Sequence, residues 1–184
     1  MDFVAFPKIP RLSREVVITE KLDGTNASVH IYKDTTTDWL TEVLRIKAGS
    51  RNRWITPEDD NYGFAKWVEA NKEELMKLGE GTHYGEWWGQ GIQRGYDLKE
   101  KRFSLFNTGR WNKDNVPSCC HVVPVLHQGI FSTDKAAETI MELRDFGSAA
   151  SIGFKKPEGI MIYHTAAGQY FKKTIENDEK GKSE

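Results

Sequence analysis

The stretch Glu20-Lys21-Leu22-Asp23-Gly24-Thr25-Asn26 decides how the rest of the chain is interpreted. It places a lysine two residues before an Asp-Gly pair. Strand-like runs flank it: residues 16–18 are all β-branched, and residues 27–32 alternate apolar with polar. A lysine at a strand end beside a tight turn is a candidate covalent nucleophile, because lysine amines attack phosphates and carbonyls. For this segment alone, a hairpin turn beside a solvated lysine is the simpler interpretation.

Five further motifs follow in order along the chain. They are Ser50-Arg51-Asn52-Arg53, Tyr84-Gly85-Glu86-Trp87, Phe103-Ser104-Leu105-Phe106-Asn107, Pro157-Glu158-Gly159-Ile160-Met161-Ile162 and Tyr170-Phe171-Lys172-Lys173-Thr174. Together with Lys-x-Asp-Gly, they resemble the covalent nucleotidyltransferase superfamily of DNA ligases, RNA ligases and mRNA capping enzymes. The form with Asn26 five residues after Lys21 is most similar to the ATP-dependent RNA ligase branch. The resemblance covers nearly the whole chain.

The resemblance implies an α+β fold, with antiparallel sheets flanked by helices, as in ligase adenylation domains. It also implies a three-step reaction with ATP and Mg²⁺ or Mn²⁺. Lys21 would take AMP from ATP, AMP would pass to a 5′-phosphate end, and a 3′-hydroxyl would displace AMP to seal the strand. A DNA ligase core, a GTP-dependent capping-type core and a non-catalytic module that binds nucleic-acid ends remain as alternatives.

The residues around the nucleophile take their expected roles from the same resemblance. Asp23 would form the turn, and Gly24 would let the backbone approach a phosphate. Asn26 would matter for strand sealing. Glu20 is expected at the edge of the purine, where a carboxylate or a carbonyl can accept a hydrogen bond from an adenine amine.

Three motifs supply the expected contacts to the nucleoside. Arg51 would hold ribose or phosphate with its planar fork of donors, and Arg53 is its rival two residues later. Glu86 would accept a hydrogen bond from a ribose hydroxyl. Phe106 is preferred over Phe103 as the ring that stacks on the base.

The last two motifs supply the expected contacts to metal and phosphate. Glu158 would hold the metal, since Mg²⁺ binds one or two carboxylates together with water and phosphates. Lys172 would contact the α-phosphate. The family has Lys-x-Lys here, whereas this chain has adjacent lysines between Phe171 and Thr174. Which of Lys172 and Lys173 faces the phosphate is therefore open, and both are catalytic candidates.

Periodicity predicts two helices among many short strands, which also favours an α+β fold. Thr56 is the expected N-cap of an amphipathic helix that ends at Gly79, and a second helix is expected over residues 133–146, closed by Gly147. In that second helix, the expected apolar face comprises Ala137, Ile140, Met141 and Arg144. Strands are expected at 42–48, 82–87, 102–106, 122–126, 159–164 and 169–175.

Composition limits the class of protein. The chain has 184 residues, 38% of them apolar, and a formal net charge of −1. We expect one nucleotidyltransferase domain over residues 1–176 and a disordered polar tail over 177–184. No run of about 18 apolar residues exists, which argues against a membrane span. A net charge near zero means that nucleic-acid affinity has to come from a local basic patch.

The expected partners are ATP and nucleic acid, namely RNA ends or alternatively DNA ends. About ten residues follow Thr174, too few for the second domain that most such ligases carry. Either the core alone would then capture the substrate, or a partner protein or second subunit would do so. Cys119 and Cys120 are adjacent, which disfavours a disulfide. We therefore expect a reducing compartment, the cytoplasm, and a phage-encoded origin stays open.

Overall fold

The computed structural model describes residues 2–34 and 43–179. The chain divides into two compact units. Unit 1 comprises Met1–Lys21 and Pro124–Glu184, and unit 2 comprises Leu22–Val123. The boundary falls within the stretch that carries the proposed nucleophile, because Lys21 closes the first segment of unit 1 and Leu22 opens unit 2.

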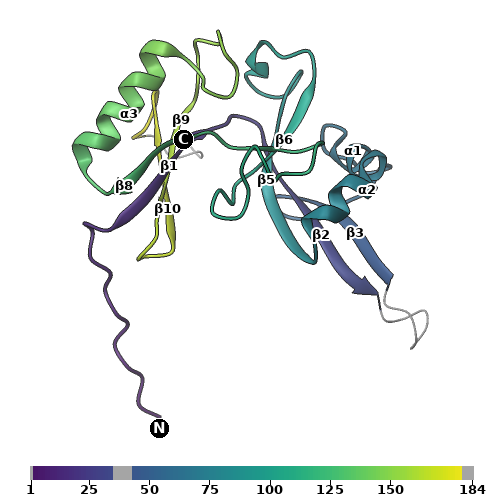
Figure 1. Cartoon of the computed structure of the whole chain (residues 1–184), viewed down its shortest axis with the longest axis horizontal. Coiled ribbons are helices and arrows are strands. Elements are labelled where there is room, and N and C mark those ends of the chain that lie inside the picture. The colour runs from purple at the N-terminus through teal and green to yellow at the C-terminus, as the bar shows by residue number, and fades with distance from the viewer. Residues whose placement is uncertain (1, 35–42, 180–184) are drawn as a thin grey trace. The chain divides into compact units, whose positions relative to one another are not determined.

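Unit 1 is a four-stranded antiparallel sheet with the order β10-β9-β1-β8, and one helix, α3, packs on one face (Figure 1). Apolar side chains alternate along the central strands, so one face of the sheet is buried against the helix. That core contains Val16, Ile18, Leu143, Ile160 and Ile162. The elements are β1 (Glu15–Lys21), β8 (Val125–Ile130), α3 (Thr133–Phe146), β9 (Gly159–His164) and β10 (Gln169–Thr174).

Unit 2 is a six-stranded sheet with the order β4-β3-β2-β5-β6-β7. Short helices cover one face and bury Phe64, Val68, Leu75 and Leu78 against apolar residues of the strands. All pairs are antiparallel except β6 with β7. The elements are β2 (Thr25–Asp34), β3 (Val43–Ser50), β4 (Trp54–Ile55), α1 (Phe64–Ala70), α2 (Lys72–Leu75), the 3₁₀ turns η1 (Met76–Leu78) and η2 (Gly95–Asp97), β5 (Gly81–Gly89), β6 (Lys101–Leu105) and β7 (His121–Val122).

The first predicted helix differs from the structure at its start and in its middle. It begins at Phe64, not beside Thr56, because the Asp60 carboxylate accepts hydrogen bonds from the backbone N–H groups of Ala65 and Lys66. The helix is interrupted at Asn71, which separates α1 from α2. The predicted end at Gly79 is confirmed.

The second helix is confirmed over Thr133–Phe146, with the Ser132 hydroxyl accepting from the Lys135 N–H at its start. Of its predicted apolar face, Ile140 packs against the core, whereas Ala137, Met141 and Arg144 are exposed. The buried residues are Ala136, Thr139 and Leu143, whereas Met141 is half exposed. Helix positions three and four apart share a face, so the apolar stripe begins at Ala136.

The strand expected over 122–126 is two strands, β7 and β8, divided at residues 123–124. Pro124 has no backbone N–H to donate to a continuing ladder. The other expected strands are present with small shifts at their ends, and Glu42 lies outside the described residues. Of the expected tail, residues 180–184 lie outside the described range, and the extent of the 1–176 domain stays a prediction. No helix of the described chain is long and apolar enough to cross a membrane.

Candidate active site

Lys21 stands at the end of β1, opposite Gly159 on β9. Its ammonium group donates a hydrogen bond to the Glu158 carboxylate and forms an ion pair with it. Both side chains are mostly buried, at 16% and 14% exposure. A side chain at residue 159 would overlap the Lys173 carbonyl oxygen, so glycine lets β10 pack against the strand that positions Glu158.

The strand register decides which lysine of β10 shares a face with Lys21. Lys172 pairs with Met161 of β9, and Met161 pairs with Thr19 of β1. Directly paired residues lie on the same face of a sheet, and alternate residues of a strand do too. Thr19, Lys21 and Lys172 are therefore on one face, and Lys173 is on the other.

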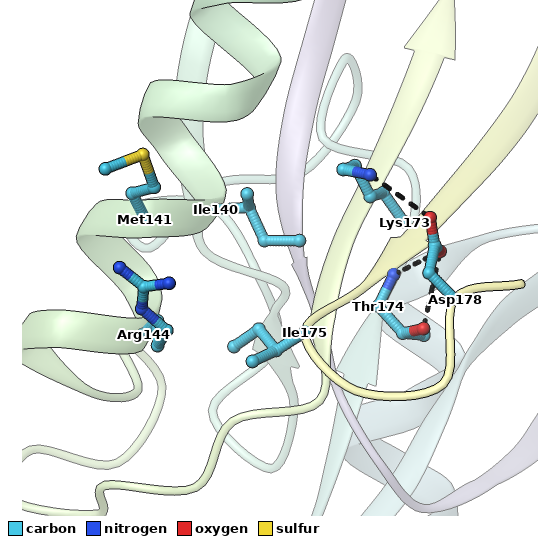
Figure 2. Close-up of a pocket in the computed structure, with 7 residues that line it drawn as sticks. All are labelled: Ile140, Met141, Arg144, Lys173, Thr174, Ile175 and Asp178. Atoms are coloured by element: carbon cyan, nitrogen blue, oxygen red, sulfur yellow. Dashed lines mark hydrogen bonds and ion pairs between the residues drawn. The ribbon is translucent and has the colours of Figure 1, made fainter.

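Lys173 faces the side of the sheet that carries α3. Figure 2 shows its ammonium directed at Asp178. The nitrogen–oxygen distance is 3.1 Å, and a hollow of about 210 Å³ lies beside this ion pair, between α3 and β10. The Thr174 N–H and the Lys173 ammonium hold the pKa of Asp178 below its ordinary value. The structure thus gives Lys173 a local structural partner, and its catalytic role as the second family lysine has no support in this geometry.

Glu20 does not occupy the position that the sequence suggested. Its side chain is 1% exposed and points to the α3 side of the sheet. It accepts hydrogen bonds from the Ser148 hydroxyl at 2.6 Å and from the N–H groups of Ala149 and Ala150. Burial raises the pKa of this carboxyl, and the three hydrogen bonds oppose that shift. The expected purine contact of the Glu20 side chain is therefore corrected to support of the 148–151 turn.

In unit 2, residues of the 89–97 loop form hydrogen bonds with the Asp23-Gly24 turn that follows the nucleophile. The Asp23 N–H donates to the Tyr96 hydroxyl at 2.9 Å, and Arg94 forms an ion pair with the Asp23 carboxylate at 3.0 Å. An added Cβ at Gly24 would lie 2.7 Å from the Trp88 Cβ and would overlap the Trp87 carbonyl oxygen. Only glycine therefore lets this turn lie against β5.

Asn26 and Glu86 pair directly across β2 and β5. The Asn26 amide donates to one Glu86 oxygen at 3.2 Å, and the Gly24 N–H donates to the other at 3.1 Å. Glu86 is 8% exposed and Asn26 is exposed. The two predicted site residues thus form one hydrogen-bonded group with the Gly24 backbone.

The two rival arginines after β3 differ in their contacts. Arg53 forms an ion pair with Asp59, and one of its nitrogens lies 2.9 Å from the carboxylate. Within the described residues, Arg51 forms no hydrogen bond or ion pair. Both line a polar hollow of about 290 Å³ whose lining is completed by Thr25, Ser50, Asn52 and Asn61. The guanidinium of Arg51 is therefore available to a ligand.

The two phenylalanines of the third motif also differ. Phe103 is fully buried and packs against Phe64 and Trp67, with ring centroids 5.0 and 5.7 Å apart. Phe106 is partly exposed, and its N–H donates to the Tyr84 carbonyl at 3.0 Å. Phe103 belongs to the core, and Phe106 remains the stacking candidate.

The family follows from comparison with known proteins. The model of the family described as RNA ligase matches residues 14–175. The chain belongs to the RNA ligase family. No curated protein was found to match this chain.

Solved RNA ligase structures show the same fold. Naegleria gruberi RNA ligase with PPi aligns with a TM-score of 0.60 at 24% identity, covering 88% of this chain and 50% of that one. A mutant of that ligase with AMP and Mn aligns with a TM-score of 0.60 at 22% identity, covering 89% and 50%. Another mutant, with ATP and Mn, aligns with a TM-score of 0.59 at 22% identity, covering 90% and 51%. The chain thus spans about half the length of these RNA ligases.

Sequence reasoning missed Arg94 and Tyr96 in this RNA ligase family chain. The sequence did contain a signal for this loop, because residues 89–97 include three glycines. All three have a positive φ in the structure. Such a segment forms tight turns and can bring distant residues back to a site. Tyr96 itself is fully buried with a φ of 53°, a backbone conformation that its surroundings must hold in place.

Proposed function

We propose that this chain is an ATP-dependent RNA ligase, which joins 5′-phosphate and 3′-hydroxyl ends through a lysyl-AMP intermediate. One observation carries the proposal. Lys21, paired with Glu158, shares a sheet face with Lys172 in a chain whose family match runs from residue 14 to 175. A nucleophile and a cation on one face suit attack on a phosphate.

The residues of unit 1 would carry out the first step. The Lys21 amine attacks the α-phosphorus of ATP, a nitrogen–phosphorus bond forms, and pyrophosphate leaves as the α–β phosphoanhydride bond breaks. The amine proton is lost to solvent. Attack needs a neutral amine, so the Lys21–Glu158 ion pair has to open when nucleotide binds. Lys172 would stabilise the negative charge that develops on the α-phosphate.

The residues of unit 2 would bind the nucleoside and later the strand end. Glu86 offers a carboxylate to a ribose hydroxyl, Phe106 a ring to the base, and Arg51 a free guanidinium to a phosphate. The later steps return the lysine to its starting state. A 5′-phosphate oxygen attacks lysyl-AMP and displaces Lys21, and a 3′-hydroxyl then attacks that 5′-phosphate and displaces AMP.

Glu158 fits the expected metal, Mg²⁺ or Mn²⁺. Its carboxylate lies beside the nucleophile, and hard cations of this kind bind one or two carboxylates with water and phosphates. The described residues contain no group of three His, Cys, Asp or Glu that could hold a metal by themselves. ATP would therefore supply the other ligands. When bound, the metal neutralises phosphate charge.

The finer assignments of partner and compartment belong to the same proposal. RNA ends are the expected polynucleotide substrate, in keeping with the family. Both cysteines are free thiols, which supports a reducing compartment such as the cytoplasm.

Labelling with radioactive nucleotide tests this function. Wild-type protein with α-labelled ATP and Mg²⁺ or Mn²⁺ should form a covalent adduct that is stable to base and labile to acid, as a phosphoramide is. Lys21→Ala should abolish the adduct. Persistent labelling of that variant would show that the nucleophile is another residue, and stronger labelling by GTP than by ATP would favour a capping-type enzyme.

A further inference from the structure

The sheet of unit 2 has one face turned away from α1 and α2, and at Trp88 this face is covered by Tyr96 of η2, with ring centroids 4.9 Å apart. Along β2, Val29 and Ile31 are fully buried in the core, so His30 and Tyr32 point to the opposite face. The register extends this face sideways, because His30 pairs with Lys47 of β3 and Ser28 pairs with Tyr84 of β5. Asn26, two residues before Ser28, lies on the same face.

Aromatic rings and a cation gather on this open face. His30 stacks on Tyr32 with ring centroids 5.4 Å apart, and the Trp54 ring lies 5.5 Å from His30. The Lys47 ammonium lies 5.0 Å from the centre of the Tyr32 ring. Trp54 and Tyr84 are 55% and 63% exposed, so their rings are accessible to a ligand.

Gly49 and Lys47 show how the face is left open. Gly49 pairs with Trp54, and an added Cβ at Gly49 would lie 2.5 Å from the Ser28 hydroxyl oxygen, so glycine leaves room for Ser28 beneath the Trp54 ring. In the described chain no carboxylate pairs with Lys47, whereas neighbouring Arg45 is tied to Asp34 at 3.2 Å. The charge of Lys47 is therefore available to an anion.

We infer that this aromatic face, defined by His30, Tyr32, Lys47, Trp54 and Tyr84, binds the single-stranded RNA segment next to the end being joined. This inference rests on the proposed function. Exposed aromatic rings stack on bases of any sequence, and a lysine among them neutralises a phosphate. The face is continuous along β2 with Asn26 and Glu86. At about 3.3 Å per residue, Asn26 to Tyr32 spans about 20 Å, enough for several nucleotides.

Binding of RNA in the absence of ATP tests the inference directly. A fluorescein-labelled oligouridylate of about twelve nucleotides, comparable to single-strand site sizes, is titrated with full-length protein at low salt, and anisotropy gives Kd. Trp54→Ala and Tyr32→Ala should each weaken binding about tenfold, because each removes a stacking partner. Trp54→Phe should restore most of the affinity. Phe146→Ala, at an aromatic residue of unit 1 that is 78% exposed, should leave Kd unchanged.

The salt dependence of RNA binding distinguishes the contribution of the Lys47 charge from that of the aromatic rings. Lys47→Ala should lower the slope of log Kd against log salt by about 0.7, the value for one phosphate contact on a single strand. Trp54→Ala should lower affinity without changing the slope. Unchanged Kd in both Trp54→Ala and Tyr32→Ala, in variants with native circular dichroism, would overturn the inference. An equal loss in Phe146→Ala would overturn it too.

Self-labelling with ATP distinguishes failure of this inference from failure of the proposed function. The labelling step needs no RNA, so the aromatic-face variants should label Lys21 at the wild-type rate yet seal preadenylylated RNA more slowly. If wild-type protein does not label but binds RNA through Trp54, the ligase function fails and the binding face stands. If it labels and seals while Trp54→Ala seals equally well, the face fails and the function stands.

Discussion

Each unit contains two closely spaced basic residues, and in each unit only one of the two forms an ion pair with an aspartate. In unit 1, Lys173 pairs with Asp178, whereas Lys172 on the opposite face of β10 has no ion-pair partner in the described chain. In unit 2, Arg53 pairs with Asp59, whereas Arg51 lines the polar hollow without a protein partner among the described residues. The paired members stabilise their own loops, and the other members remain free to bind phosphate.

The largest expected effect is the difference in the rate of lysyl-AMP formation between the Lys172→Ala and Lys173→Ala variants. Lys172→Ala should slow formation of lysyl-AMP about 100-fold or more, because it removes a charge contact to the α-phosphate. Lys173→Ala should change the rate by less than about threefold, since the side chains of its ion pair with Asp178 are 46% and 37% exposed and solvent-accessible pairs contribute little. Labelling with ATP under single-turnover conditions measures both rates. A greater loss in Lys173→Ala would mean that the register of β10 in solution differs by one residue.

A smaller difference in activity is expected between the Arg51→Ala and Arg53→Ala variants. Arg51→Ala should reduce labelling or sealing about tenfold or more, because a free guanidinium offers two parallel hydrogen bonds to a phosphate. Arg51→Lys should recover only part of the activity, since lysine lacks that fork. Arg53→Ala is the matched control and should affect the 53–59 loop with little change in rate. Equal losses in the two alanine variants would show that Arg53 leaves Asp59 to bind substrate.

A substitution at Asn26 should affect labelling with ATP and strand sealing differently. Asn26→Ala should keep labelling with ATP within a few-fold of wild type, yet seal a preadenylylated strand about tenfold more slowly. The exposed amide is held by Glu86 at the edge where the strand end would bind. Gln128→Ala removes a comparable strand amide, bonded to Glu15 at 2.8 Å in unit 1, and should change neither step. Loss of labelling in Asn26→Ala would assign Asn26 to the nucleotide instead.

The sequence predicted those features whose signals are local. The 133–146 helix has Ser132 at its start and Gly147 after its end, and both boundaries were predicted. The helix after residue 56 was misplaced because its capping group, Asp60, acts from four to six residues upstream and outside the usual N-cap position. The break at Asn71 has no local signal as strong as a proline or glycine.

The site required information that no local pattern contains. The side to which Lys172 points depends on its pairing with Met161, and hence on the register of three strands. The contacts of Asp23 with Arg94 and Tyr96 join residues more than seventy positions apart. The partners of the Glu20 side chain, Ser148, Ala149 and Ala150, lie 128 to 130 positions further along the chain.

The smallest effect concerns Glu20 and the pH dependence of stability. Burial raises the pKa of this carboxyl above the ordinary value of 4.5. Between that value and the raised pKa, the folded state binds more protons than the unfolded state. The contribution of Glu20 to the free energy of unfolding therefore falls as pH rises through this window and levels off above it.

Glu20→Gln should remove that decline, because an amide does not titrate and can still hydrogen-bond with Ser148 and the N–H groups of the 148–151 turn. Urea unfolding at pH 4.5, 5.5, 6.5 and 7.5 gives the free energy of unfolding for both proteins, and their difference isolates the contribution of Glu20. The exposed Glu69, changed to Gln, controls for the loss of one carboxylate. A difference between wild type and Glu20→Gln that stays constant with pH would mean that the hydrogen bonds from Ser148, Ala149 and Ala150 cancel the effect of burial.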